Sequence, residues 1–132
     1  MIPEKFDFEY AVELNMLAGL LLPSTNLLSM YHPYLKSSYW QDSVLSDLVA
    51  FSLGFFVKYK TPPSLISLSN YIKSDVVKIP LKLKLVEQYK MVWEELSMVL
   101  VNDKNSDFKY SVDKLVDFIQ RKELERQAIK IL

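Results

Sequence analysis

The side chains that could do chemistry in this chain are few and scattered. Its one histidine, His32, stands directly before Pro33, and the sequence has no cysteine and only two glycines. A hydrolase triad would have to use His32, a metal site would need more histidines or cysteines, and a phosphate-binding loop would need clustered glycines. We interpret His32 as an ordinary loop residue. We predict no catalytic residue, no metal site and no cofactor-binding site within the 132 residues.

Two kinds of charged cluster resemble functional sites but have simpler interpretations. The carboxylates of Glu94 with Glu95, and of Glu123 with Glu125, belong to different sides of a helix and stand beside basic residues, which is typical of solvated faces. The segments 58–60 and 82–84 mix lysines with aromatic or apolar residues, as grooves for single-stranded nucleic acid do. Each segment is small and has acidic residues nearby. Contact with nucleic acid is therefore the minor interpretation.

Composition places the chain among globular domains. Hydrophobic residues make up 50% of it and charged residues 24%, which is enough to bury a core without a disulfide. The formal net charge is zero, which argues against a dedicated duplex-binding module or a small DNA-binding regulator. Residues 1–57 hold two lysines and six acidic residues, so this part carries −4 and the remainder +4.

We also expect a cytoplasmic protein that does not contact a membrane. The apolar run at 14–22 is shorter than the roughly 20 residues that a membrane-spanning helix needs. Acidic residues precede this run, whereas a signal peptide carries positive charge there. The lack of cysteine fits a reducing compartment.

Apolar residues recur at helical spacing along the chain, and no alternating strand pattern occurs. Any binding surface of this protein should therefore be formed by helices. We predict an all-α fold of one domain. It consists of a small bundle of four short-to-medium helices over 1–79, followed by an antiparallel helical hairpin over 80–132 that runs into the start of a linker helix. The bundle helices are predicted at about 8–22, from a cap at Ser24 to near Tyr31, at 42–59 and, after a cap at Ser64, at 65–72.

The helix at 42–59 is apolar nearly all round, which predicts a central helix surrounded by the others. Before it, the connection at 31–40 is rich in aromatic residues. We expect this connection to be a packed loop that is anchored in the core.

Two apolar stripes predict the hairpin. The first lies in a helix at about 80–101 and the second in a helix after the polar turn at 102–106. Two long helices joined by such a short turn should pack antiparallel. We predict that six residues divide between hairpin packing and a protein interface: Val86, Tyr89, Trp93, Val112, Leu115 and Ile119. The pattern leaves open whether Tyr89 and Trp93 form an interface hot spot or pack in the core.

The apolar pattern changes phase near the end of the chain. After the charged residues 121–123 it resumes at Leu124, Ala128 and Ile131. Either the buried face of the helix rotates here, or a new partner covers the new face. The sequence stops inside this helical pattern without a capping residue, so we expect it to be a piece of a longer protein.

Four segments follow one another in a recognisable order. They are the leucine-rich opening helix at 13–22, the aromatic pairs at 34–42, the tyrosine and proline step at 56–68, and the closing helix at 108–129. This order resembles the N-terminal domain of DnaB-like replicative DNA helicases, in particular of divergent phage members. The resemblance covers most of the chain, although Ser67 stands where the family often has an acidic residue.

The resemblance implies a scaffold role in DNA replication. Such domains pair through the hairpin, help to build a hexameric ring around single-stranded DNA, and contact primase or a helicase loader. It implies self-association of this chain as a dimer or ring, with single-stranded DNA bound only by the full-length ring. ATP and Mg²⁺ would act in a downstream motor domain. The alternative is a free-standing helical adaptor without catalytic activity, such as a phage helicase loader or a host-interaction protein.

Overall fold

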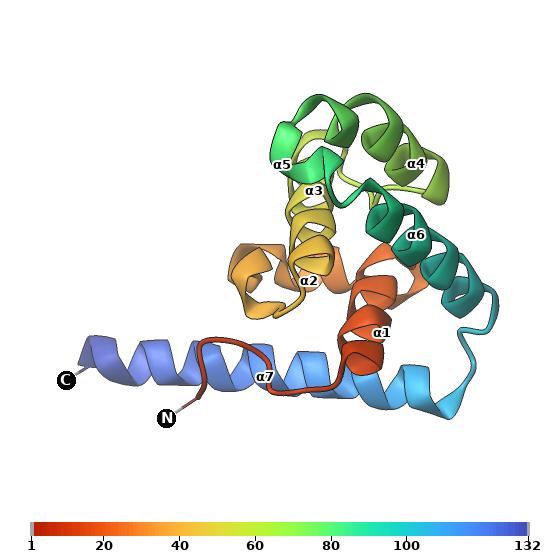
Figure 1. Cartoon of the computed structure of the whole chain (residues 1–132). Helices are drawn as coiled ribbons and strands as arrows, with labels where there is room; N and C mark the ends of the chain where they lie inside the picture. The colour runs from red at the N-terminus through yellow and green to blue at the C-terminus, as the bar shows by residue number, and fades with distance from the viewer. Residues whose placement is uncertain (1, 132) are drawn as a thin grey trace.

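The computed structural model describes residues 2–131, and every regular element in this range is a helix. The predicted all-α fold is thereby confirmed. Met1 and Leu132, the outer ends of the two predicted segments, lie outside the described residues. Figure 1 shows α7 running along one side of the molecule, with the other helices gathered on it.

The first half of the chain holds four α-helices and the short 3-10 turns between them. The elements are α1 (Tyr10–Leu21), η1 (Pro23–Thr25), α2 (Leu27–Tyr31), η2 (His32–Tyr34), η3 (Ser37–Tyr39), α3 (Ser43–Tyr59) and α4 (Leu65–Ser74). The second half contains one more 3-10 turn and three α-helices, two of them long. They are η4 (Val76–Lys78), α5 (Pro80–Leu83), α6 (Val86–Val101) and α7 (Ser106–Ile131).

Side-chain caps fix the starts of α3 and α4. Asp42 caps α3, because one of its carboxylate oxygens accepts hydrogen bonds from the amides of Val44 and Leu45, each at 3.0 Å. Ser64 caps α4, as predicted, and its hydroxyl accepts a hydrogen bond from the amide of Ser67 at 3.2 Å. These two caps set where both helices begin.

Two predicted helix boundaries are wrong. The residue before α2 is Asn26, in the left-handed region with φ 54°, whereas the predicted cap Ser24 lies inside η1. The predicted helix at 80–101 is divided into α5 and α6, because Leu85 leaves helical geometry with φ −105° and ψ 12°. With this break, Lys82 of α5 reaches the carboxylate of Asp47 in α3.

A buried carboxylate anchors the aromatic connection that precedes α3. Glu13 of α1 is 2% exposed, and its two carboxylate oxygens accept hydrogen bonds from the backbone and side-chain amides of Gln41, at 2.9 and 2.8 Å. The indole of Trp40 donates to the backbone carbonyl of Glu13 at 3.0 Å. Glu13 therefore holds the connection against α1, and both of its carboxylate oxygens have hydrogen-bond partners.

Helix α1, rather than α3, is surrounded by other helices. Eight of the twelve residues of α1 are buried, and it packs against α3, α6 and α7. Helix α3 buries one side only, and Ala50, Gly54 and Lys58 on its other side are exposed. The prediction of a central helix at 42–59 is therefore wrong. Several apolar residues of α3 line an open groove, which is described below.

The predicted antiparallel hairpin is also wrong in its packing. Helix α7 packs chiefly against α1, whereas α6 packs against α4, α1 and α3, and Figure 1 shows α6 and α7 diverging from the turn that joins them. Gly19 explains how α1 takes this place. A Cβ atom on Gly19 would lie 2.9 Å from Cγ2 of Val112, so the missing side chain allows α1 and α7 to approach closely. The stripe of α7 faces α1, the stripe of α6 faces α4, α1 and α3, and one core spans the two predicted segments.

Candidate protein-interaction surfaces

Three of the six predicted interface residues are fully buried in the core. Tyr89 and Ile119 are 2% exposed and Leu115 is 0% exposed. A side chain with so little free surface is used in packing within the chain, so these three lie on the packing side of the predicted division. All three belong to the single hydrophobic core.

The other three predicted residues are half-buried, and they also make packing contacts within the chain. Val86, Trp93 and Val112 pack against the edge of the core. The indole of Trp93 donates a hydrogen bond to the backbone carbonyl of Leu65 at 2.8 Å, which ties α6 to the start of α4. Of the two alternatives for Tyr89 and Trp93, an interface hot spot or core packing, the contacts of both residues favour packing within the chain.

The hydroxyl of Tyr89 belongs to a polar cluster that joins four helices. Tyr71 and Tyr89 donate hydrogen bonds to one carboxylate oxygen of Asp47, at 2.6 and 2.8 Å. Lys82 pairs with the other carboxylate oxygen at 2.8 Å and donates to the Tyr71 hydroxyl at 3.0 Å. We refer to these four residues as the Asp47 cluster. Its members come from α3, α4, α5 and α6, so the cluster fixes these helices relative to one another.

Electrostatics in the Asp47 cluster favour one charged pair and two neutral hydroxyls. Burial raises the pKa of Asp47, but hydrogen bonds from Lys82, Tyr71 and Tyr89 outweigh it and leave this pKa below its ordinary value. The hydrogen bond to Asp47 raises the pKa of Lys82. Burial, followed by the hydrogen bond to Asp47, raises the pKa values of Tyr71 and Tyr89. Both oxygens of Asp47 are occupied, which suits a structural role better than proton transfer.

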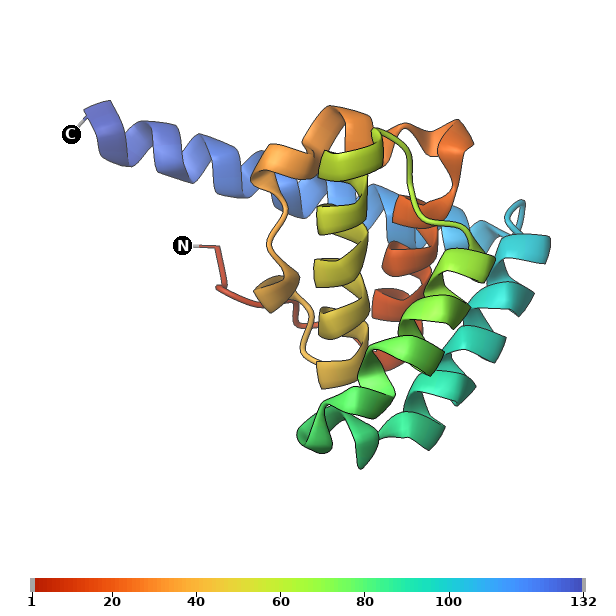
Figure 2. The ribbon, with the colours of Figure 1, turned by 90° about the horizontal axis from the view of Figure 1, so that it is seen from above.

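The C-terminal part of α7 presents apolar side chains to solvent. Leu124 is 67% and Ile131 85% exposed, and Ala128 between them is exposed as well. Leu124 follows the buried Leu115 by nine positions, which is two and a half helical turns and therefore the opposite side of the helix. Figures 1 and 2 show this end of α7 extending beyond the other helices. The change of phase seen in the sequence thus produces a second, open face.

A groove beside Leu124 continues this open face onto the rest of the molecule. It has a volume of about 370 Å³ and is lined by Tyr31, Tyr34, Gln127 and Leu124, among others. We define Tyr31, Tyr34, Leu124, Ala128 and Ile131 as the α7-end surface. The phase change is visible in the sequence, but nothing there connects it with the two tyrosines, because they lie about 90 residues earlier in the chain.

A second candidate surface lies between α3 and α4. This groove, of about 570 Å³, has the small residues Ala50 and Gly54 on one side and four aromatic residues along it. The aromatic residues are Phe51, Phe55, Tyr59 and Tyr71. We call it the α3–α4 groove. The Asp47 cluster supports it, because the ring of Tyr71 lines the groove while its hydroxyl is held by Asp47.

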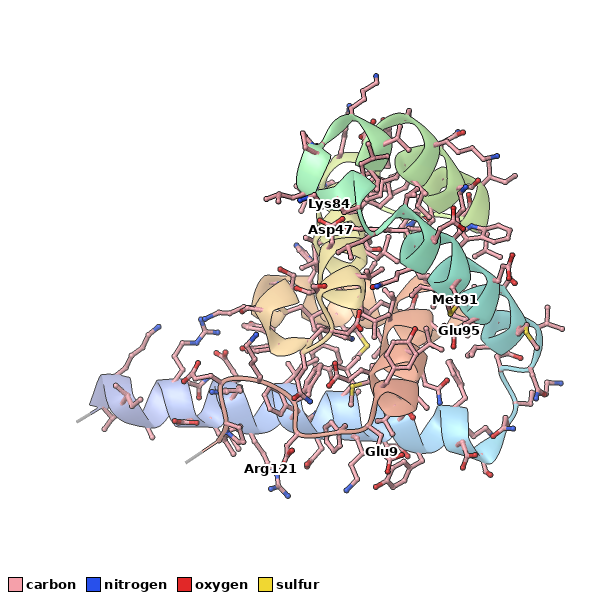
Figure 3. All side chains as sticks on the ribbon, in the orientation of Figure 1. Glu9, Asp47, Lys84, Met91, Glu95 and Arg121 are labelled. Carbon is pink, nitrogen blue, oxygen red and sulfur yellow. The ribbon has the colours of Figure 1, made fainter. Side chains whose placement is uncertain are left out.

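Positive charge is concentrated in residues 58–86, although the α3–α4 groove itself is lined by one lysine and one acid, Lys58 and Asp75. Residues 58–86 contain six lysines and a single acidic residue, Asp75, and so carry a net charge of +5. Lys82 is engaged in the Asp47 cluster, and the other five lysines are exposed: Lys58, Lys60, Lys73, Lys78 and Lys84. The two basic segments singled out in the sequence lie at different ends of α3, because Lys58 is near its last residue whereas Lys82 contacts Asp47 near its start. Figure 3 shows Lys84 at the end of the molecule formed by α4 and α5, away from α7.

Comparisons with protein families, with curated proteins and with solved structures find no match for this chain. In residues 2–131, no three histidine, cysteine, aspartate or glutamate residues gather in a way that could hold a metal ion. None of the helices in the same range is long and apolar enough to cross a membrane. Function is therefore inferred from the two surfaces and from the sequence resemblance.

Proposed function

We propose that this chain is a self-associating interaction domain, the N-terminal scaffold of a DnaB-like replicative DNA helicase that forms a ring. In this role it joins copies of the helicase during DNA replication and contacts primase or a loader, while ATP and Mg²⁺ act in a downstream motor. The observation that carries the proposal is the apolar stripe of Leu124, Ala128 and Ile131, which faces solvent opposite the packed face of α7. Exposed apolar surface of this kind is typical of protein contacts.

The proposed contact differs from the one expected from the sequence. Tyr89, Leu115 and Ile119 are used inside the monomer, so self-association is assigned to the α7-end surface. Burying Leu124 and Ile131 would contribute roughly 1.5–3 kcal/mol each, less than the ~8 kcal/mol of a micromolar complex. We therefore expect the groove lined by Tyr31 and Tyr34 to take part in the same contact.

Sedimentation velocity over a range of protein concentrations tests the self-association. The double variant Leu124→Asp with Ile131→Asp should remain monomeric where the unmodified chain associates, because two carboxylates would have to be desolvated in the contact. Ile66→Asp is the matched control, since Ile66 is 75% exposed on α4, away from α7. Circular dichroism should show the same helix content in all three proteins.

Two results would contradict the assignment. The unmodified chain could stay monomeric at its highest soluble concentration, or the double variant could associate as the unmodified chain does. The first result would remove self-association, and the second would move it to another surface.

Reading the coding frame past Leu132 tests the helicase part of the proposal separately. A continuation that contains a glycine-rich phosphate loop would support a ring helicase. A stop codon directly after residue 132 would contradict it and leave the free-standing adaptor.

A further inference from the structure

The outer side of α6 presents two methionines to solvent. Met91 is 57% and Met98 is 73% exposed. The exposed Glu87 and Glu94 alternate with them at three- and four-residue spacing, so all four side chains lie on one side of the helix. We define Glu87, Met91, Glu94 and Met98 as the α6 outer face. Figure 3 shows Met91 on the side of the molecule away from the C-terminal end of α7.

The α6 outer face is acidic. Helix α6 contains three glutamates and one lysine, so it carries a net charge of −2, and the turn at 102–105 adds one acid and one lysine, which cancel. Lys90 pairs with Glu87 at 3.5 Å, and Glu95 accepts a hydrogen bond from Tyr10 of α1 at 2.9 Å. The exposed Glu94 lies between the two methionines. A partner with apolar side chains and positive charge would complement this face.

The end of α7 has the opposite charge. Residues 121–131 contain four basic and two acidic residues, so this segment carries a net charge of +2. Asp117, just before it, pairs with Arg121 at 3.1 Å, but both side chains are more than half exposed, so the pair is weak. Two α7 ends would repel each other, whereas one α7 end would be attracted to an α6 outer face.

The two surfaces also match in spacing and shape. Leu124 and Ile131 are seven residues apart, as are Met91 and Met98, which is about 10.5 Å along a helix. Two such helices can interdigitate both pairs of side chains. The groove of about 370 Å³ beside Leu124 is lined by two tyrosines. It suits a methionine, because the flexible thioether fills irregular apolar space and packs favourably on aromatic rings.

A ring requires a second surface of this kind. An isologous contact uses the same surface on both copies and stops at two copies, whereas a heterologous contact joins two different surfaces and can close into a ring. Helix α6 and the end of α7 lie on opposite sides of the molecule in Figures 1 and 2. The end of α7 therefore cannot cover the α6 of its own chain and is presented to a neighbouring copy.

We propose that the α7 end of one copy packs on the α6 outer face of the next copy. Leu124 and Ile131 lie against Met91 and Met98 of the neighbouring copy, and Glu94 of that copy faces the basic segment 121–131. This inference rests on the proposed self-association. It adds the surface that receives the α7 end and makes the contact heterologous.

Sedimentation velocity of single and mixed variants tests this contact. The α6 variant carries Met91→Arg and Met98→Arg, because arginine repels the α7 end and is about as good a helix former as methionine. The α7 variant carries Leu124→Asp and Ile131→Asp. Leu81→Arg is the matched control, since Leu81 is 75% exposed on α5. Each protein is run alone, and the α6 and α7 variants are also mixed in equal amounts.

Both variants should be monomeric at concentrations at which the unmodified chain and Leu81→Arg associate, with unchanged helix content by circular dichroism. Their mixture should form dimers and nothing larger. The α6 variant keeps its α7 end and the α7 variant keeps its α6 outer face, so one contact can form and no further copy can be added. Glu94→Lys is a milder second variant. It should weaken association at low salt and have a smaller effect at high salt.

Three outcomes would overturn the proposal while leaving self-association in place. The α6 variant could associate as the unmodified chain does, or the mixture could stay monomeric although both variants are folded; either result would mean that the α7 end binds elsewhere. Unchanged association of Glu94→Lys at low salt would remove the charge complementarity that selects this contact. A monomeric unmodified chain would instead contradict the proposed self-association itself, and this inference with it.

Discussion

Asp47 illustrates how a single carboxylate can organise several helices. Its oxygens accept hydrogen bonds from two tyrosines and pair with Lys82, and no buried side-chain polar atom within residues 2–131 lacks a partner. Removing the carboxylate would leave the hydroxyl of the buried Tyr89 without its acceptor. An unsatisfied buried polar group of this kind typically costs stability.

Asp47→Ala should therefore lower the free energy of unfolding by about 1–3 kcal/mol. Asp113→Ala is the matched control, since Asp113 is exposed on α7, and such surface changes usually stay within about 0.5 kcal/mol. Urea unfolding followed by circular dichroism gives both values. Equal stability of the two variants would show that the Asp47 cluster does not hold the helices together.

Stability should also depend on pH through the Asp47 cluster, on both sides of neutrality. The pKa of Asp47 is lowered on folding, so its contribution is present above the unfolded value near 3.8 and is lost as the pH falls through the lower folded value. The pKa of Tyr71 is raised, so its contribution is present below the unfolded value near 10.0 and is lost as the pH rises above it. Lys82 has a raised pKa and acts in the same direction as Tyr71.

The difference in unfolding free energy between the unmodified chain and Asp47→Asn isolates this effect. It should be constant near neutral pH and should shrink below about pH 4, where the unmodified carboxylate becomes protonated. Urea titrations across the acid range measure it. A difference that stays constant down to the acid-unfolded state would mean that Asp47 is not charged in the folded protein.

At the residue scale, missing residue types are easier to recognise from the sequence than the contact partners of the residues present. One histidine and no cysteine are visible directly, and they exclude several kinds of site. The Asp47 cluster was not predictable, because Tyr71 and Tyr89 lie 24 and 42 residues from Asp47 and no local spacing connects them. A usable signal was present at Glu13. A lone acid within an otherwise apolar helical stretch indicates a buried and hydrogen-bonded carboxylate.

At the scale of elements, the two glycines show that helix packing and intrinsic helix propensity can act in opposite directions. Gly19 and Gly54 both lie inside helices, where alanine is normally more stable by roughly 0.5–1 kcal/mol. The two sites differ in their surroundings. A Cβ on Gly19 would press on Val112, a branched and stiff side chain of α7, whereas a Cβ on Gly54 would meet nothing within 4 Å in the described chain.

Gly54→Ala should consequently raise the melting temperature, and Gly19→Ala should lower it. Shortening Val112 to alanine should restore part of the loss in Gly19→Ala, because the two changes share one contact. Thermal unfolding of the two single variants, of Val112→Ala and of the double variant checks this. If both glycine substitutions were stabilising, α1 and α7 would not be in close contact at Gly19.

Helix positions were largely predictable, and helix partners were not. Capping by Ser64 and the turn at 102–105 have local causes, so they follow from neighbouring residues. The stripes of α6 and α7 were also recognisable, but an apolar stripe does not specify which helix covers it. Here α1 covers the stripe of α7, and α4, α1 and α3 together cover the stripe of α6. The prediction of a central α3 failed for a related reason, since an apolar helix side can be buried by its own chain or kept open as a groove.

At the scale of the whole molecule, the end of α7 lies apart from the rest of the fold. It extends past the other helices on one side, and α4 and α5 lie away from it (Figures 1 and 2). The core between them contains buried residues from Phe6 to Ile119. This projecting end would allow a scaffold to associate with itself without disturbing the core.

The continuous core also predicts that the whole chain unfolds as one unit. Leu115 and Leu124 are the same residue type on one helix, but Leu115 is completely buried and Leu124 is mostly exposed. Leu115→Ala should cost about 2–5 kcal/mol, and Leu124→Ala should be nearly neutral. The loss of stability should also affect α4, at the opposite end of the molecule. Trp93 donates a hydrogen bond to the start of α4 and packs on the same core as Leu115.

Tryptophan fluorescence and far-ultraviolet circular dichroism should therefore report the same urea midpoint for Leu115→Ala, shifted equally from that of the unmodified chain. Two separate midpoints would instead indicate that the segments 1–79 and 80–132 unfold independently, as a bundle and a hairpin would. Coincident midpoints are the expected result, since α1 belongs to the first segment and contacts both long helices of the second.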